Sequence, residues 1–167
     1  MPYTLNADEV FEMAEQMERN GAMFYHRAAD LTLDADSRKL LIDLAVMEED
    51  HEKTFAAIRA TIITGADREP TVFDPEGLTE KYLWAWADRN VFDLDSDPFE
   101  VLGEAFTIEK LVQAAIGREK DSIVFYEGLK TWLKKDADRQ KIQSIIQEEM
   151  GHIALLAQMR REFRQAT

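Results

Sequence analysis

Cysteine is absent from the 167-residue chain. Its absence excludes disulfide bonds, thiolate metal sites, iron–sulfur clusters and thiol catalysis within this sequence. Positive charge is also scarce, because 20 Lys and Arg stand against 33 Asp and Glu, which gives a net charge of −13. A chain of this charge repels a phosphate backbone, so we expect no nucleic-acid partner.

Long apolar runs are missing as well. No stretch approaches the roughly 20 apolar residues that span a bilayer. The opening segment, "MPYTLNADEVFEM", lacks the basic and apolar parts of a secretory signal. We therefore expect a cytoplasmic protein with no membrane partner. The length and a hydrophobic share of 46% predict a single domain, residues 1–167, with a sizeable core.

The sequence is rich in helical periodicity. Apolar and small residues recur at helical spacing from about residue 7 until "DLTLDAD", and again from about residue 37 to 64. Residues 65–97 read as a connection that holds a short aromatic helix, "TEKYLWAWADRN". Asp97 and Pro98 then have the residue types that begin a helix, which we expect to run to about residue 133, and Asp136 begins another. The pattern predicts an all-α four-helix bundle, with one helical hairpin over 7–64, a crossover over 65–97 and a second hairpin over 98–165.

Histidine occurs only three times, yet two of the three share one acidic spacing. Glu48 precedes His51 by three residues in "VMEEDHEKTF", and Glu149 precedes His152 by three in "IIQEEMGHIALL". Residues at i and i+3 lie on the same face of a helix. One such pair alone is typical of a solvated surface, so the weight of the observation lies in its repetition.

The two predicted hairpins repeat each other at an offset of 101 residues. Few other positions match, so the copies share mainly an acid, aromatic and histidine set. The matched pairs are Glu18 and Glu119, Phe24 and Phe125, Tyr25 and Tyr126, Glu48 and Glu149, and His51 and His152.

Each of the four long helices carries one of these glutamates in its apolar stripe, and four buried carboxylates repel one another unless cations neutralise them. Two divalent ions balance the four charges, and the two imidazoles complete a ligand set of the kind found in di-iron and di-manganese bundles. Oxygen and imidazole ligands suit iron or manganese, and zinc also fits. The candidate ligands are Glu18, Glu48, His51, Glu119, Glu149 and His152.

Other polar residues lie near these positions. Tyr25 and Tyr126 each follow a candidate glutamate by seven residues, and we expect their hydroxyls to hydrogen-bond the ligand carboxylates. The alternative is a pair of core tyrosines bonded elsewhere. Glu15 and Glu52 flank the inner face as further ligands or, more simply, as charges at the helix boundary, and His26 is expected at the rim.

The ligand pattern resembles the rubrerythrin-like branch of the ferritin-like superfamily. The segments that carry the resemblance are "MERNGAMFYHRAA", "MEEDHEKTF", "REKDSIVFYEGL" and "QEEMGHIALL". It implies the same six ligands, with Glu48 and Glu149 as the bridging pair, and a ferritin-like antiparallel bundle in which the second and third long helices are parallel. The tryptophans of the connection, Trp84 and Trp86, lie outside it and are expected to pack or to contact a second copy in a homodimer.

Two departures from that family bear on function. Rubrerythrins carry a rubredoxin domain whose iron is held by cysteines, and this sequence has none, so we expect any electron donor to be another protein. The family's additional glutamate, three residues after the helix-three ligand, is Ser122 here.

Three functions remain open. The first is an oxidoreductase that reduces hydrogen peroxide or oxygen at a dinuclear iron site, with Gly21, Ala22 and Ser122 leaving room for the oxidant. The second is a ferroxidase or iron-storage protein. The third is a helical bundle whose metals are structural.

Overall fold

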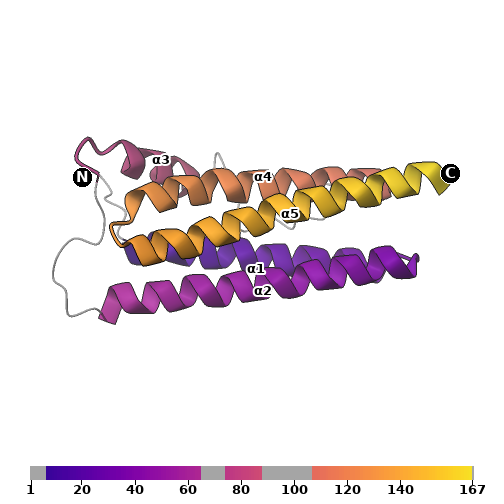
Figure 1. Ribbon diagram of the computed structural model, residues 1–167, viewed down its shortest axis with the longest axis horizontal. Coiled ribbons are helices and arrows are strands. Elements are labelled where there is room, and N and C mark those ends of the chain that lie inside the picture. The colour runs from indigo at the N-terminus through magenta and orange to yellow at the C-terminus, as the bar shows by residue number, and fades with distance from the viewer. Residues whose placement is uncertain (1–6, 65–73, 88–106, 167) are drawn as a thin grey trace.

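The computed structural model describes residues 7–64, 74–87 and 107–166, and these form five helices. The four long helices lie side by side as two antiparallel hairpins, α1 with α2 and α4 with α5, and α2 runs parallel to α4 (Figure 1). The predicted all-α bundle, the parallel pair and the short helix in the connection are therefore confirmed. The helices are α1 (Ala7–Leu31), α2 (Ala35–Thr64), α3 (Leu78–Ala87), α4 (Ile108–Trp132) and α5 (Asp136–Ala166). No helix among these described residues is long and apolar enough to cross a membrane.

The turn between α1 and α2 is tight because side chains satisfy the helix ends. The Thr32 hydroxyl donates to the carbonyl of Ala28 at 2.7 Å, at the end of α1. The carboxylate of Asp34 accepts from the amide of Ser37 at 2.8 Å and caps the start of α2. The sequence indicated an interruption of the helical pattern around Asp34, and the structure has a short turn there that connects α1 to α2.

The third long helix begins later than its sequence indicated. Thr107 is extended, with φ −135° and ψ 149°, and its side chain accepts from the amide of Lys110. This cap sets the start of α4 at Ile108, ten residues after the predicted start at Pro98. The start signals at Asp97 and Pro98 lie outside the described residues.

The apolar core forms two clusters, one toward each end of the bundle. On α1, Val10 to Met17 contribute to the first cluster and Phe24 to Ala29 to the second. On α4 the order is reversed, because Ile108 to Ala115 contribute to the second cluster and Phe125 to Leu129 to the first. Glu18 and Glu119 therefore each lie between the two apolar stretches of their helix, with packed side chains on both sides of that level.

The short helix α3 packs against α4. The Tyr82 hydroxyl donates to the carbonyl of Val124 at 2.6 Å, and the Trp86 ring lies 5.9 Å from that of Phe125. Trp86 is buried within its own chain, which confirms the packing interpretation for this residue. The Trp84 side chain is outside the described ones, and the homodimer stays a prediction.

Candidate metal centre

The structure brings all six predicted ligand residues together in the interior. Each of the four long helices supplies one glutamate, and α2 and α5 each add the histidine that lies one turn further along. All six are buried, with exposed fractions of 4% or less: Glu18, Glu48, His51, Glu119, Glu149 and His152. The sequence repeat thus becomes a spatial cluster, because equivalent positions of the two hairpins face each other.

The cluster divides into two overlapping groups of potential ligand atoms. The first group is Glu18, Glu48, His51 and Glu149, and the second is Glu48, Glu119, Glu149 and His152. Within each group the atoms lie within 4.8 Å of one another. Glu48 and Glu149 belong to both groups, so each group has one glutamate and one histidine of its own and shares the other two carboxylates.

Several buried polar atoms at this centre have no hydrogen-bond partner within the described part of the chain. His51 Nδ1 lies 3.1 Å from a Glu149 oxygen, and His152 Nδ1 lies 2.9 Å from the other oxygen of the same carboxylate. Neither contact has the geometry of a hydrogen bond, and the shared carboxylate atoms Glu48 Oε1, Glu149 Oε1 and Glu149 Oε2 are likewise unpaired. Unpaired buried lone pairs are costly and therefore call for a partner. The donor set of four carboxylates and two imidazoles fits two divalent cations.

Without a metal, these groups must share protons. Burial and the nearby charge of Glu48 raise the pKa of Glu18 and of Glu119 well above the usual range. Burial also acts to raise the pKa of Glu48 and Glu149, but contacts that include His152 outweigh it and lower both values. The metal-free cluster therefore keeps protons on one glutamate of each hairpin and leaves the shared pair ionised.

The two histidines complete this charge balance. Burial acts to lower the pKa of His51, but contacts with Glu149 and Glu18 raise it well above its usual value. In the same way, contacts with Glu119 and Glu149 raise the pKa of His152 to about 12. Two imidazolium ions then balance two carboxylates in the apolar interior. Divalent cations bound at the same place would take over that balance and displace the protons.

Each predicted tyrosine hydrogen-bonds a carboxylate of the opposite hairpin. Tyr25 donates to Glu119 Oε1, and Tyr126 donates to Glu18 Oε1. Both hydroxyls are buried, and burial together with the adjacent carboxylate raises the pKa of each tyrosine well above its usual value. The tyrosines therefore stay protonated, and they hold in place the two glutamates that are not shared between the groups.

A further carboxylate, which was not among the predicted site residues, contacts the centre from outside. Glu148 of α5 approaches the outer ring nitrogen of His51, with 3.0 Å between its Oε2 and the histidine Nε2. The contact crosses from α5 to α2. The only available signal was the position of Glu148 immediately before a candidate ligand.

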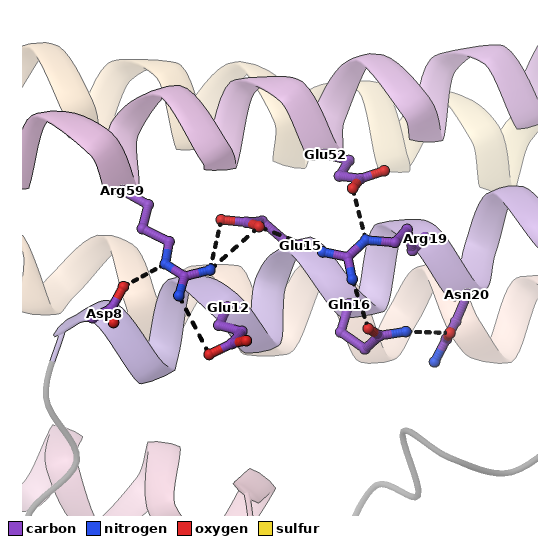
Figure 2. Close-up of polar contacts among 8 residues, drawn as sticks. All are labelled: Asp8, Glu12, Glu15, Gln16, Arg19, Asn20, Glu52 and Arg59. Carbon is purple, nitrogen blue, oxygen red and sulfur yellow. Dashed lines mark hydrogen bonds and ion pairs between the residues drawn. The ribbon is translucent and has the colours of Figure 1, made fainter.

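The other acidic candidates, Glu15 and Glu52, pair with arginines and belong to neither group of potential ligand atoms. Arg59 binds Asp8, Glu12 and Glu15, as Figure 2 shows, with 3.3 Å between its Nη1 and Glu15 Oε1. Arg19 binds Glu52, with 2.7 Å between its Nε and Glu52 Oε1 (Figure 2). Glu15 and Glu52 therefore serve the packing of α1 on α2.

Two further residues that the sequence singled out, His26 and Gly21, have neighbours that define their roles. His26 lies at the surface, 3.0 Å from Glu49, as expected for a rim residue. At Gly21 the sequence suggested room for an oxidant, but that space holds the Glu48 side chain. A Cβ atom placed on Gly21 would lie 3.3 Å from the Glu48 carboxylate. The glycine thus gives room to a shared carboxylate.

Comparisons with known proteins agree on the fold. A crystal structure from Thermotoga maritima, assigned as a ferritin-like diiron-carboxylate protein, superposes with a TM-score of 0.67 at 20% sequence identity. The match covers 97% of this chain and 99% of that one. No protein-family model matches the sequence, and no curated protein matches it at a significant level. The chain therefore has a ferritin-like fold in which two overlapping groups of buried carboxylate and imidazole ligands lie at the centre.

Proposed function

We propose that this protein is a non-haem di-iron carboxylate oxidoreductase that reduces hydrogen peroxide or oxygen and takes its electrons from an external donor protein. The observation that carries the proposal is the pair of overlapping ligand groups that share Glu48 and Glu149. A shared pair of carboxylates would hold two ions close together, so that two ferrous ions could each contribute one electron to the reduction of one oxidant molecule.

The protein's own residues define where that chemistry takes place. When bound, two ferrous ions supply the two electrons that convert hydrogen peroxide and two protons into two water molecules, and the donor later returns two electrons. Glu48 and Glu149 keep the two positions adjacent, while Tyr25 and Tyr126 fix the remaining carboxylates. The apolar clusters on either side exclude bulk water and so strengthen every electrostatic interaction at the centre.

The proposal extends to a rubrerythrin-like type of activity, with iron as the metal. The matched hairpins with their Glu-x-x-His pairs and tyrosines support that type. Ser122 stands where that family has an additional glutamate, so we propose that this centre works with six ligands only. The four described long helices offer carboxylate and imidazole ligands at one centre, and we propose that a separate protein donates the electrons.

The test is to reconstitute the protein with ferrous iron without oxygen and to count the metal. We expect two irons per chain in the wild type and a clear loss in Glu119→Ala, because that glutamate belongs to only one of the two groups. Glu109→Ala is the matched control, since Glu109 lies on the same helix and pairs with Arg164 at the surface. Adding hydrogen peroxide should then produce the near-ultraviolet bands of ferric iron within the mixing time.

The other functions give different results in the same experiment. Continued uptake of iron well beyond two per chain under air would favour storage. Two tightly held ions that neither peroxide nor oxygen oxidises would favour a structural role. Iron binding that is indifferent to Glu119 would show that the carboxylate cluster is not the working centre.

A further inference from the structure

The two histidines of the centre differ in what their outer nitrogen contacts. His51 directs Nδ1 toward Glu149 Oε1 at 3.1 Å, and its Nε2 lies 3.0 Å from Glu148 Oε2. Glu148 is half exposed, with 49% of its side chain accessible, whereas His51 is buried. The ring therefore has its inner nitrogen free for a cation and its outer nitrogen next to a carboxylate.

His152 has no such arrangement. Its Nδ1 faces Glu149 and Glu48, at 2.9 and 3.3 Å, just as His51 faces the centre from the other side. Its Nε2 is buried and has no hydrogen-bond partner among the residues that the structure describes. At the repeat offset, the position equivalent to Glu148 is Met47. A thioether is a weak acceptor and carries no charge. The twofold likeness of the two hairpins thus fails at this position.

We propose that Glu148 makes the two metal positions inequivalent, so that the position formed with Glu18 and His51 binds a divalent cation more tightly and fills first. A carboxylate on the outer nitrogen places the histidine proton there, which leaves the lone pair of Nδ1 directed at the cation. It also makes the imidazole a stronger donor. Loss of such a partner typically costs 10–100-fold in metal affinity. This inference rests on the dinuclear site proposed above and adds an order of loading to it.

The test is a titration of metal-free protein with Co²⁺, followed by calorimetry and by the visible absorption of the bound ion. Wild-type protein should bind two ions in two steps whose affinities differ by roughly 10–100-fold. Glu148→Ala should weaken the tighter step by about that factor and still bind two ions. Glu18→Ala should abolish the tighter step, and Glu119→Ala the weaker one.

Two variants separate this effect from a general change of charge. Glu49→Ala also removes a partly exposed carboxylate that lies 3.0 Å from a histidine, but that histidine, His26, is not a candidate ligand. It should leave both steps unchanged. Met47→Glu places a carboxylate at the position equivalent to Glu148, and it should strengthen the weaker step.

The outcomes distinguish this inference from the proposed function. Wild-type protein that fails to bind two Co²⁺ ions would overturn both. Two ions bound with equal affinity, or a Glu148→Ala variant that behaves like Glu49→Ala, would overturn only the role of Glu148. A tighter step that survives Glu18→Ala would likewise contradict the assignment of the position.

Discussion

Tyr25 and Tyr126 each tie a carboxylate of one hairpin to the other hairpin. Because Tyr25 donates to Glu119 and Tyr126 to Glu18, the two hydrogen bonds cross the bundle in opposite directions. Each bond satisfies one oxygen of a buried carboxyl group that belongs to one of the two ligand groups. We therefore expect the tyrosines to affect metal affinity through the orientation of the glutamate that each one binds.

Replacing Tyr25 by phenylalanine tests that role. Tyr25→Phe removes only the hydroxyl, so we expect about tenfold weaker binding at the position that uses Glu119. Binding at the position of Glu18 should change little. Tyr82→Phe is the control, because its hydroxyl bonds the backbone of α4 away from the centre. Calorimetric titration with Co²⁺ gives both affinities, and equal values in wild type and Tyr25→Phe would contradict the prediction.

Gly21 permits the close approach of α1 to Glu48. Alanine at this position should stabilise the helix itself by up to about 1 kcal/mol, yet its Cβ atom would lie 3.3 Å from the carboxylate. We therefore expect Gly21→Ala to weaken binding of both metal ions, because Glu48 belongs to both groups.

The matched control for Gly21→Ala is a glycine with open space. Gly117 lies within α4, and a Cβ atom there would meet nothing within 4 Å. Gly117→Ala should raise the free energy of unfolding in urea by about 0.5–1 kcal/mol and leave metal affinity unchanged. If both variants bind metal equally well, the space at Gly21 does not position Glu48.

At the scale of the elements, the contacts that hold α3 on α4 include a close approach of Tyr82 to Gly128. A Cβ atom on Gly128 would clash with the Tyr82 ring, so the glycine is what lets that ring rest on the helix. Leu83 and Trp86 of the same short helix are buried in the first apolar cluster. Displacing α3 would therefore uncover part of the core next to Phe125.

We expect Gly128→Ala to destabilise the protein by about 1–3 kcal/mol, the usual cost of overpacking. The measurement is the midpoint of urea unfolding with an unchanged slope. In a Tyr82→Ala background the same substitution should cost little, since the clashing ring is gone. A full cost in both backgrounds would mean that the close contact with Tyr82 does not hold α3 in place.

The helices also show which features could be predicted from the sequence and which could not. The helical period and the repeat at offset 101 predicted the two hairpins and the six residues that meet at the centre, because both depend on local spacing. The start of α4 differed from the prediction. Asp97 and Pro98 have residue types that commonly begin a helix, but in the structure Thr107 caps the helix and α4 starts at Ile108. The Glu148 contact with His51 joins two helices through a position outside the repeat, so no spacing rule could find it.

At the scale of the whole molecule, the metal-free centre places ionisable side chains inside an otherwise apolar core. A neutral balance there needs protons on both histidines and on Glu18 and Glu119, whose pKa values are all raised in the folded protein. In the unfolded chain these groups lose their protons near pH 6.5 and pH 4.5. Above pH 6.5 the folded state therefore binds more protons than the unfolded state, so its stability falls as pH rises. The lowered pKa values of Glu48 and Glu149 act only below about pH 4.5.

This sign leads to a prediction that compares the metal-free and metal-loaded forms. Between pH 7 and 10 the metal-free protein should lose stability, with one retained proton alone giving a slope of about 1.4 kcal/mol per pH unit. The metal-loaded protein has exchanged those protons for cations, so its unfolding free energy should stay nearly level. The gap between the two melting temperatures should therefore widen as pH rises, and calorimetry in buffers of different ionisation heat should record protons released on metal binding.

A variant that removes one of these protons sharpens the test. His152 retains its proton up to a pKa of about 12, so His152→Gln should lower the slope of the metal-free form across pH 7–10 by one proton's contribution, about 1.4 kcal/mol per pH unit. Substituting the surface residue His26 in the same way should leave that slope as in the wild type. Metal binding that releases no protons at pH 7, with parallel melting curves for both forms, would mean that the folded cluster does not hold the protons assigned to it. The carboxylates would then have to be reconciled with the apolar core by some means other than exchange between protons and cations.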